Sequence, residues 1–302
     1  MNTMQYISEQ QIASNNIKLN YDSFGDPAHP AIILIMGLAT QMIFWDSDIC
    51  RQLAQQGFWV LRFDNRDIGK STHMTQLNPP SGLAFLLNIL TGKKLQSAYQ
   101  LSDMAADTLG LMDALNIPRA HIVGASMGGM IAQILAIQAP QRVISLTSIM
   151  STTGNRALPR AKNSTLLKLL TTPAKNAEDY VKRGLNIWRI LHADHFPFDA
   201  KKISELLQLS WQRGVNGQGI SRQLAAILAS PDRTIDLAKL KIPSLVIHGS
   251  LDPLLPLDCG IATAKAIPQA KFLSYQGMGH TIPVEIQQDV VMQIINLAKS
   301  CE

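Results

Sequence analysis

The stretch of sequence that decides the fold is residues 120–140, AHIVGASMGGMIAQILAIQAP. It opens with a short apolar run, passes through small residues on both sides of Ser126, and continues into an apolar segment of helical length. A strand that is buried on both faces of a parallel sheet is a continuous apolar run of this kind. The stretch therefore predicts a strand at 120–126 that turns sharply into a helix at 127–140.

The turn matches the pattern G-x-S-x-G, written here as Gly124-Ala125-Ser126-Met127-Gly128. A serine that joins a strand directly to a helix has a strained backbone, so its neighbours must be small. The helix that follows presents free amide N–H groups and the positive end of its dipole beside the serine. Ser126 is therefore the candidate nucleophile. The alternative is a tight glycine-rich turn that holds a buried structural serine.

Strand and helix patterns alternate on both sides of this unit. Strand patterns lie at 15–24, 31–37, 58–64, 143–150, 243–250 and 271–279, and helical patterns lie at 49–57, 102–117 and 282–300. Ser102 is the expected N-cap of its helix. This alternation is typical of an α/β fold with a doubly wound, mostly parallel β-sheet and helices on both faces.

A long interval between two strands breaks the alternation. About 90 residues separate Met150 from Ser244, whereas a crossover between parallel strands needs roughly a dozen. The interval contains helical patterns, one of them at 163–172, and no strong strand. We therefore expect an inserted helical cap at 152–236, and a core domain made of residues 1–151 and 237–302.

The expected cap is strongly basic. It contains 13 Lys/Arg and 7 Asp/Glu, so it accounts for the charge of the whole chain, which is +5. We expect a solvated helical face, and the alternative hypothesis is an anionic substrate or an acidic docking surface. A second irregular stretch, 72–101, contains the apolar patch 83–90. The patch predicts a short helix packed under the cap, or else a wall of the substrate entrance.

A serine nucleophile needs a base and an acid that orients the base. For a serine on such a turn, the expected order along the chain is Ser, Asp or Glu, then His. His280 follows a strand in a glycine-rich loop and is the candidate base. Of the other downstream histidines, His192 and His195 fall in the expected cap, and His248 lies inside an apolar strand, which favours a packed core residue.

The candidate acid lies where the strand at 243–250 ends. Asp252 follows this strand directly, at the edge of the sheet where α/β proteins build their sites. Asp258 is the local alternative, but it is better interpreted as the N-cap of the next helix. For the oxyanion hole, we expect the backbone N–H groups of Met127 and Leu38, with Gly37 as the alternative second donor.

Three stretches carry a resemblance to a known family. They are 35–38 (IMGL) with Trp45, 63–71 (FDNRDIGKS), and 124–129 (GASMGG). They resemble the α/β-hydrolase superfamily over essentially the whole chain. More narrowly, they are similar to the esterase branch that includes the aclacinomycin methylesterase-like enzymes. Many relatives have His-Gly at the end of the oxyanion strand. Here Met36 stands in the His position, a departure shared by this branch that leaves the backbone donor intact.

The resemblance implies hydrolysis of a carboxylic ester through an acyl-enzyme, with Ser126, His280 and Asp252 as the triad. It also implies that the charged residues of 63–71 brace loops near the site without taking part in catalysis. Alternative uses of the same triad are lactone hydrolysis, C–C bond hydrolysis, perhydrolysis and acyl transfer. A non-catalytic ligand-binding module is a more remote alternative. Apolar segments in the expected cap predict a small-molecule ester with a hydrophobic moiety.

Composition limits the remaining classes. No run of basic residues predicts nucleic-acid binding, and no apolar stretch is long enough for a membrane span. The N-terminus lacks the pattern of a signal peptide. Three widely spaced cysteines, Cys50, Cys259 and Cys301, favour a reducing interior over a disulfide framework. We therefore expect a cytoplasmic enzyme without a metal or organic cofactor, and its oligomeric state is left open.

Overall fold

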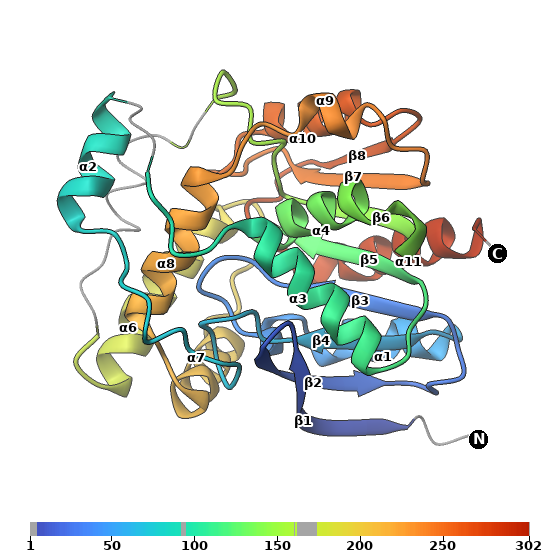
Figure 1. Cartoon of the computed structure of the whole chain (residues 1–302). Helices are drawn as coiled ribbons and strands as arrows, with labels where there is room; N and C mark the ends of the chain where they lie inside the picture. The colour runs from blue at the N-terminus through green and yellow to red at the C-terminus, as the bar shows by residue number, and fades with distance from the viewer. Residues whose placement is uncertain (1–4, 92–94, 160, 162–173, 302) are drawn as a thin grey trace.

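The computed structural model describes residues 5–91, 95–159, 161 and 174–301. Within these ranges the strands form an eight-stranded sheet in the order β1-β2-β4-β3-β5-β6-β7-β8 (Figure 1). The strands are β1 Tyr6–Ser14, β2 Ile17–Phe24, β3 Ala31–Ile35, β4 Trp59–Phe63, β5 Ala120–Ala125, β6 Val143–Ile149, β7 Ser244–Gly249 and β8 Lys271–Tyr275. Strand β2 pairs antiparallel with both β1 and β4, and the other pairs are parallel. The predicted doubly wound, mostly parallel sheet is confirmed.

The helices of the described ranges are α1 Ser47–Gln55, α2 Gly82–Thr91, α3 Leu101–Ala114, α4 Met127–Gln138, α6 Ala177–His192, α7 Ala200–Arg213, α8 Gly217–Ala229, α9 Thr234–Leu237, α10 Leu257–Ala266 and α11 Val284–Lys299, with 3-10 turns at η1 Met42–Phe44 and η2 Pro140–Arg142. Helices α3 and α4 cover one face of the sheet, and α1 and α11 cover the other. Alternate residues of β3 supply the two halves of the core, with Ile33 among residues of α3 and α4, and Ile32 among residues of α1 and α11. Because both faces of β3 are covered, its sequence is apolar throughout.

Several local expectations need correction. The segment expected as one strand at 15–24 is the second half of a hairpin, because Asn15 and Asn16 have positive φ (46° and 64°) and turn the chain after β1. Ser102 does not cap α3. Gln100 is its N-cap, and Asp103 completes a capping box. Asp258 is likewise not an N-cap, since α10 begins after Pro256 and Asp258 lies in its first turn.

The inserted helices α6, α7 and α8 gather at one end of the sheet, and α2 lies at the periphery beside them (Figure 1). The helical pattern expected at 163–172 lies outside the described residues. The predicted boundary at 236 falls inside α9, and the division into core and cap remains a prediction. Helix α2 forms where the apolar patch predicts a helix, but Leu83 and Leu87 are 64% and 39% exposed, so it is not packed fully under the insertion.

The basic residues of the insertion are only partly solvated. Arg213, Arg222 and Arg233 are buried, so the expected solvated face is wrong for these three. Arg222 is fully buried and binds the carboxylate of Asp67 through two nitrogens, at 2.8 and 2.6 Å. Arg213 forms a buried ion pair with Asp64. The arginines of α7 and α8 therefore attach the insertion to the loop that follows β4.

Candidate active site

Ser126 lies at the sharp turn between β5 and α4. Its backbone has φ 56° and ψ −119°, and its N–H donates to the carbonyl of Ile149 at 2.9 Å. A Cβ on Gly124 would lie 2.1 Å from the carbonyl oxygen of Gly128, and a Cβ on Gly128 would lie 2.1 Å from that of Ile35. The glycines of the G-x-S-x-G pattern are therefore required by close backbone packing, as the nucleophile turn predicts.

The imidazole of His280 bridges the serine and the aspartate. Its Nε2 lies 2.9 Å from Ser126 Oγ, and its Nδ1 lies 2.7 Å from Asp252 Oδ2. A carboxylate accepts only, so Nδ1–H donates to Asp252, and Nε2 of the neutral ring accepts from the serine hydroxyl. The structure thus brings together all three residues that the sequence predicts as a triad, in the order of contacts that activates a serine.

Asp252 is held by the turn that follows β7. Its Oδ1 accepts from the backbone N–H groups of Leu254 and Leu255, at 2.9 and 2.8 Å, while Oδ2 faces the histidine. The side chain is buried, so these donors compensate for the water that a carboxylate loses. The alternative acid, Asp258, is exposed in the first turn of α10.

His248 lies behind the aspartate as a core residue of β7. Its Nε2–H donates to the carbonyl of Leu255 at 2.8 Å, and Nε2 is 3.6 Å from Asp252 Oδ2. Burial lowers the pKa of His248 from its ordinary value, which favours the neutral ring. The prediction of a packed core histidine is confirmed, and this ring supports the turn that carries Asp252.

Two backbone segments meet at Ser126 as the oxyanion hole requires. Met127 is the first residue of α4, where helix N–H groups have no partner within the helix. A Cβ built on Gly37 would lie 3.0 Å from the Cβ of Ser126, so the loop after β3 runs directly beside the serine. The assignment of Leu38, or of Gly37, as the second donor remains a prediction.

The loop after β3 is braced by side chains that the sequence did not single out. Asn65 donates from Nδ2 to the carbonyl of Met36 at 3.0 Å, and Gln223 accepts from the N–H of Ala39 at 3.2 Å. Gln223 also donates to the carbonyl of Arg66 at 2.8 Å. Asn65 belongs to the charged run that was expected to brace loops, which is a partial signal. Gln223 lies on α8 and has no signal in its local sequence.

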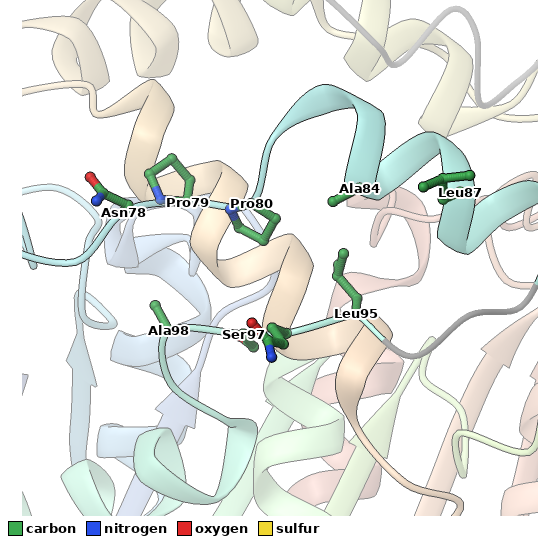
Figure 2. A pocket seen from close by; sticks show the side chains of 9 residues that line it. Asn78, Pro79, Pro80, Ala84, Leu87, Leu95, Ser97 and Ala98 are labelled. Atoms are coloured by element: carbon green, nitrogen blue, oxygen red, sulfur yellow. The ribbon is translucent and has the colours of Figure 1, made fainter.

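Two pockets lie outside this triad. One, of about 450 Å³, is bordered by Pro79 and Pro80 before α2, by Leu87 on α2 and by Leu95 after it (Figure 2). The other, of about 670 Å³, lies between α6 and α7 and is bordered by Leu185, Arg189 and Trp211. None of the triad residues lines either pocket.

Among the described residues, no cluster of three or more His, Cys, Asp and Glu side chains has the arrangement of a metal site. No helix in the described ranges combines the length and the apolar character that crossing a bilayer requires.

An array of serine, histidine and aspartate beside a mostly parallel sheet is the arrangement of hydrolases that use an activated serine. The family described as alpha/beta hydrolase fold matches residues 30–285 of the chain. The protein therefore belongs to the α/β-hydrolase fold family.

Individual relatives place the chain within this family. It is similar to rhodomycin D methylesterase DnrP of Streptomyces peucetius, with 25% identity over 94% of this chain and 96% of that protein. It is 27% identical to 3-oxoadipate enol-lactonase 2 of Acinetobacter baylyi, over 82% of this chain and 81% of that one. Among solved structures, the esterase RhEst1 from Rhodococcus sp. ECU1013 matches with a TM-score of 0.75 and 16% identity. The match covers 98% of this chain and 100% of that esterase. At that identity, the last likeness concerns the fold alone.

Proposed function

We propose that this protein is a serine hydrolase that cleaves the carboxylic ester of a small molecule through an acyl-enzyme on Ser126. The observation that carries the proposal is the position of His280, whose two ring nitrogens lie 2.9 Å from Ser126 Oγ and 2.7 Å from Asp252 Oδ2. The similarity to a rhodomycin D methylesterase over most of both chains supports an ester as the substrate.

In the first half of the reaction, Ser126 Oγ attacks the ester carbonyl carbon and its proton passes to His280 Nε2. Asp252 holds the ring through Nδ1–H and stabilises the imidazolium that forms. The tetrahedral oxyanion is bound by the backbone N–H groups of Met127 and Leu38. His280 then returns its proton to the alkoxide oxygen, so the C–O bond breaks, the alcohol leaves and the acyl group stays on the serine.

In the second half, water attacks the acyl-enzyme while His280 accepts one of its protons. The tetrahedral intermediate collapses when His280 protonates Ser126 Oγ, and the carboxylic acid is released. These steps need only the serine, the histidine, the aspartate and backbone donors, so a metal or organic cofactor has no role in them.

A second candidate is the cleavage of a lactone or a C–C bond by the same residues. It is favoured by the similarity to 3-oxoadipate enol-lactonase 2, and by 29% identity to the 2-hydroxymuconate semialdehyde hydrolase of Pseudomonas putida over 62% of this chain. Turnover of an enol-lactone or of 2-hydroxymuconate semialdehyde at a kcat/KM far above that of any simple ester would favour this candidate.

The test is hydrolysis of p-nitrophenyl esters from acetate to dodecanoate by wild type, Ser126→Ala and Ser221→Ala. Ser221 is a half-buried serine on α8 whose hydroxyl donates to the carbonyl of Gly217, and it provides the matched control. We expect hydrolysis by wild type and the control. We expect a loss of about 10⁴-fold or more in Ser126→Ala, as when triad members are removed from serine hydrolases. Equal rates for wild type and Ser126→Ala would overturn the proposal.

A further inference from the structure

The C-terminal end of α6 contacts the loop that carries His280. The backbone N–H of His280 donates to the carbonyl of Leu191 at 2.6 Å. A Cβ on Gly279 would lie 2.3 Å from the same oxygen, so only glycine permits this approach. The last carbonyls of a helix lack partners within it, and here the proposed base supplies one. A helix of the insertion is thus in direct contact with the backbone of the base.

The side chain of His192 makes a second link beside the first. Its Nε2 lies 3.1 Å from the carbonyl of Pro197, which only accepts, so Nε2 carries the proton. In the neutral ring Nδ1 then accepts from the hydroxyl of Thr281, at 2.9 Å. The ring is buried, and Thr281 directly follows the base. One nitrogen therefore binds within the insertion, and the other binds the catalytic loop.

We propose that His192 is a positioning residue for His280: its Nδ1 fixes Thr281, and with the Leu191 carbonyl it sets the place of the imidazole that activates Ser126. This inference rests on the proposed function. Productive geometry must be held to within about 0.5 Å, and a base is held there only if its own backbone is fixed. His280 has a partner on each ring nitrogen, but these do not fix the backbone from which the ring projects.

A purely structural role for His192 makes a different prediction. The turn from α6 to Pro197 passes through Ala193, which has φ 61°. In a purely structural role, the hydrogen bond from His192 Nε2 to Pro197 would hold this turn, and the contact with Thr281 would have no effect on the base. The two nitrogens separate the two roles. The Nδ1 contact concerns the base, and the Nε2 contact concerns the fold of the insertion.

The test compares His192→Asn with His192→Gln. An Asn amide occupies the position of Nδ1 and keeps an acceptor for Thr281, whereas a Gln amide occupies the position of Nε2 and keeps a donor for Pro197. Three readouts are needed: the second-order rate of Ser126 labelling by a fluorophosphonate, kcat and KM for a p-nitrophenyl ester, and the melting temperature.

We expect Ser126 to be labelled, and to be acylated by the ester, about 3- to 10-fold more slowly in His192→Gln than in His192→Asn, because one hydrogen bond is lost. The difference in ester hydrolysis should appear in kcat rather than in KM. Thr281→Val should show the same loss, and adding it to His192→Gln should cost nothing further. Equal rates for Asn and Gln, a slower rate for Asn, or rates that simply follow the melting temperatures would overturn the proposal.

The labelling readout separates this inference from the proposed function. If wild type is labelled at Ser126 but hydrolyses no ester, the positioning role can still be measured from the labelling rates, and only the substrate class is wrong. If wild type is not labelled at Ser126, the proposed function itself fails.

Discussion

At the scale of single residues, the triad depends on backbone groups as much as on its own side chains. Ser126 is held by the carbonyl of Ile149, Asp252 by the N–H groups of the turn after β7, and His280 by the carbonyl of Leu191. The Ile149 carbonyl lies in the buried strand β6, and the other backbone groups belong to half-buried residues, Leu191, Leu254 and Leu255. The side chains are therefore placed before a substrate arrives, which is the condition for electrostatic catalysis by a fixed site.

We predict that the buried side chain of His121 makes the stability of this protein depend on pH. His121 lies on β5 in the strand that leads to Ser126, is 2% exposed, and contacts Ser145 Oγ through Nδ1 at 2.9 Å. Burial lowers its pKa to about 4. Because an unfolded histidine has a pKa of about 6.5, the unfolded chain gains a proton as the pH falls while the folded chain does not. The stability contribution is present above pH 6.5 and is lost toward pH 4.

The prediction concerns His121→Asn, which keeps an amide near the position of Nδ1 but cannot ionise. Between pH 7 and pH 5, wild type should lose about 2 kcal/mol of unfolding free energy relative to this variant, measured by urea denaturation at each pH. His29→Asn, at an exposed histidine, serves as the control. If the difference in unfolding free energy between wild type and His121→Asn stays constant with pH, the burial of a neutral ring is contradicted.

At the scale of elements, the parts that could be predicted are those with one dominant local signal. The strands from β3 to β7 are apolar runs because both faces are covered, and the β5–α4 turn is marked by its glycines. Strand β1 was not predicted, because it pairs on one side only and leaves most of its side chains exposed or half-buried. The N-caps of α3 and α10 were each misplaced by two residues because capping depends on local geometry rather than on residue type alone.

The same distinction applies to the candidate site. Ser126, Asp252 and His280 were predictable because each follows a strand pattern and their order along the chain is the expected one. Asn65, Gln223 and His192 act through contacts between elements far apart in the sequence. The packing of the insertion on the sheet brings Gln223 and His192 to their partners, so the local sequence holds no signal for their roles. Asn65 joins the loops after β4 and β3, and its position in the run 63–71, expected to brace loops, is a partial signal.

At the scale of the whole molecule, buried ion pairs join helices α7 and α8 to the loop that follows β4. Burial acts to raise the pKa of Asp67. The pKa is nevertheless below its ordinary value, because the carboxylate accepts hydrogen bonds from Arg222, from the N–H of Met74 and from Tyr99. Removing one partner of such a pair leaves a buried charge without its counter-ion. The insertion is therefore expected to remain attached through α8.

We predict that Arg222→Met and Asp67→Asn each lower the unfolding free energy by about 3 kcal/mol, measured by urea denaturation. The double variant should lose less than the sum of the two, because both changes remove the same interaction. Lys239→Ala, which removes an exposed pair with Asp236, should cost less than about 1 kcal/mol. Losses of unfolding free energy that add strictly in the double variant, or single losses as small as that of Lys239→Ala, would contradict a stabilising ion pair between Arg222 and Asp67.

The central claim is that Ser126 carries the acyl group during turnover. The most direct measurement is mass spectrometry of enzyme quenched in acid during hydrolysis of p-nitrophenyl butyrate, followed by peptide mapping. The predicted result is one butyryl group per chain on the peptide that contains Ser126, absent from Ser126→Ala. In His280→Gln, Ser126 should be acylated slowly, and the butyryl-enzyme should then accumulate, because the base that activates water for its hydrolysis is missing. Steady turnover with no acyl group on Ser126, or with the acyl group on another residue, would contradict the account.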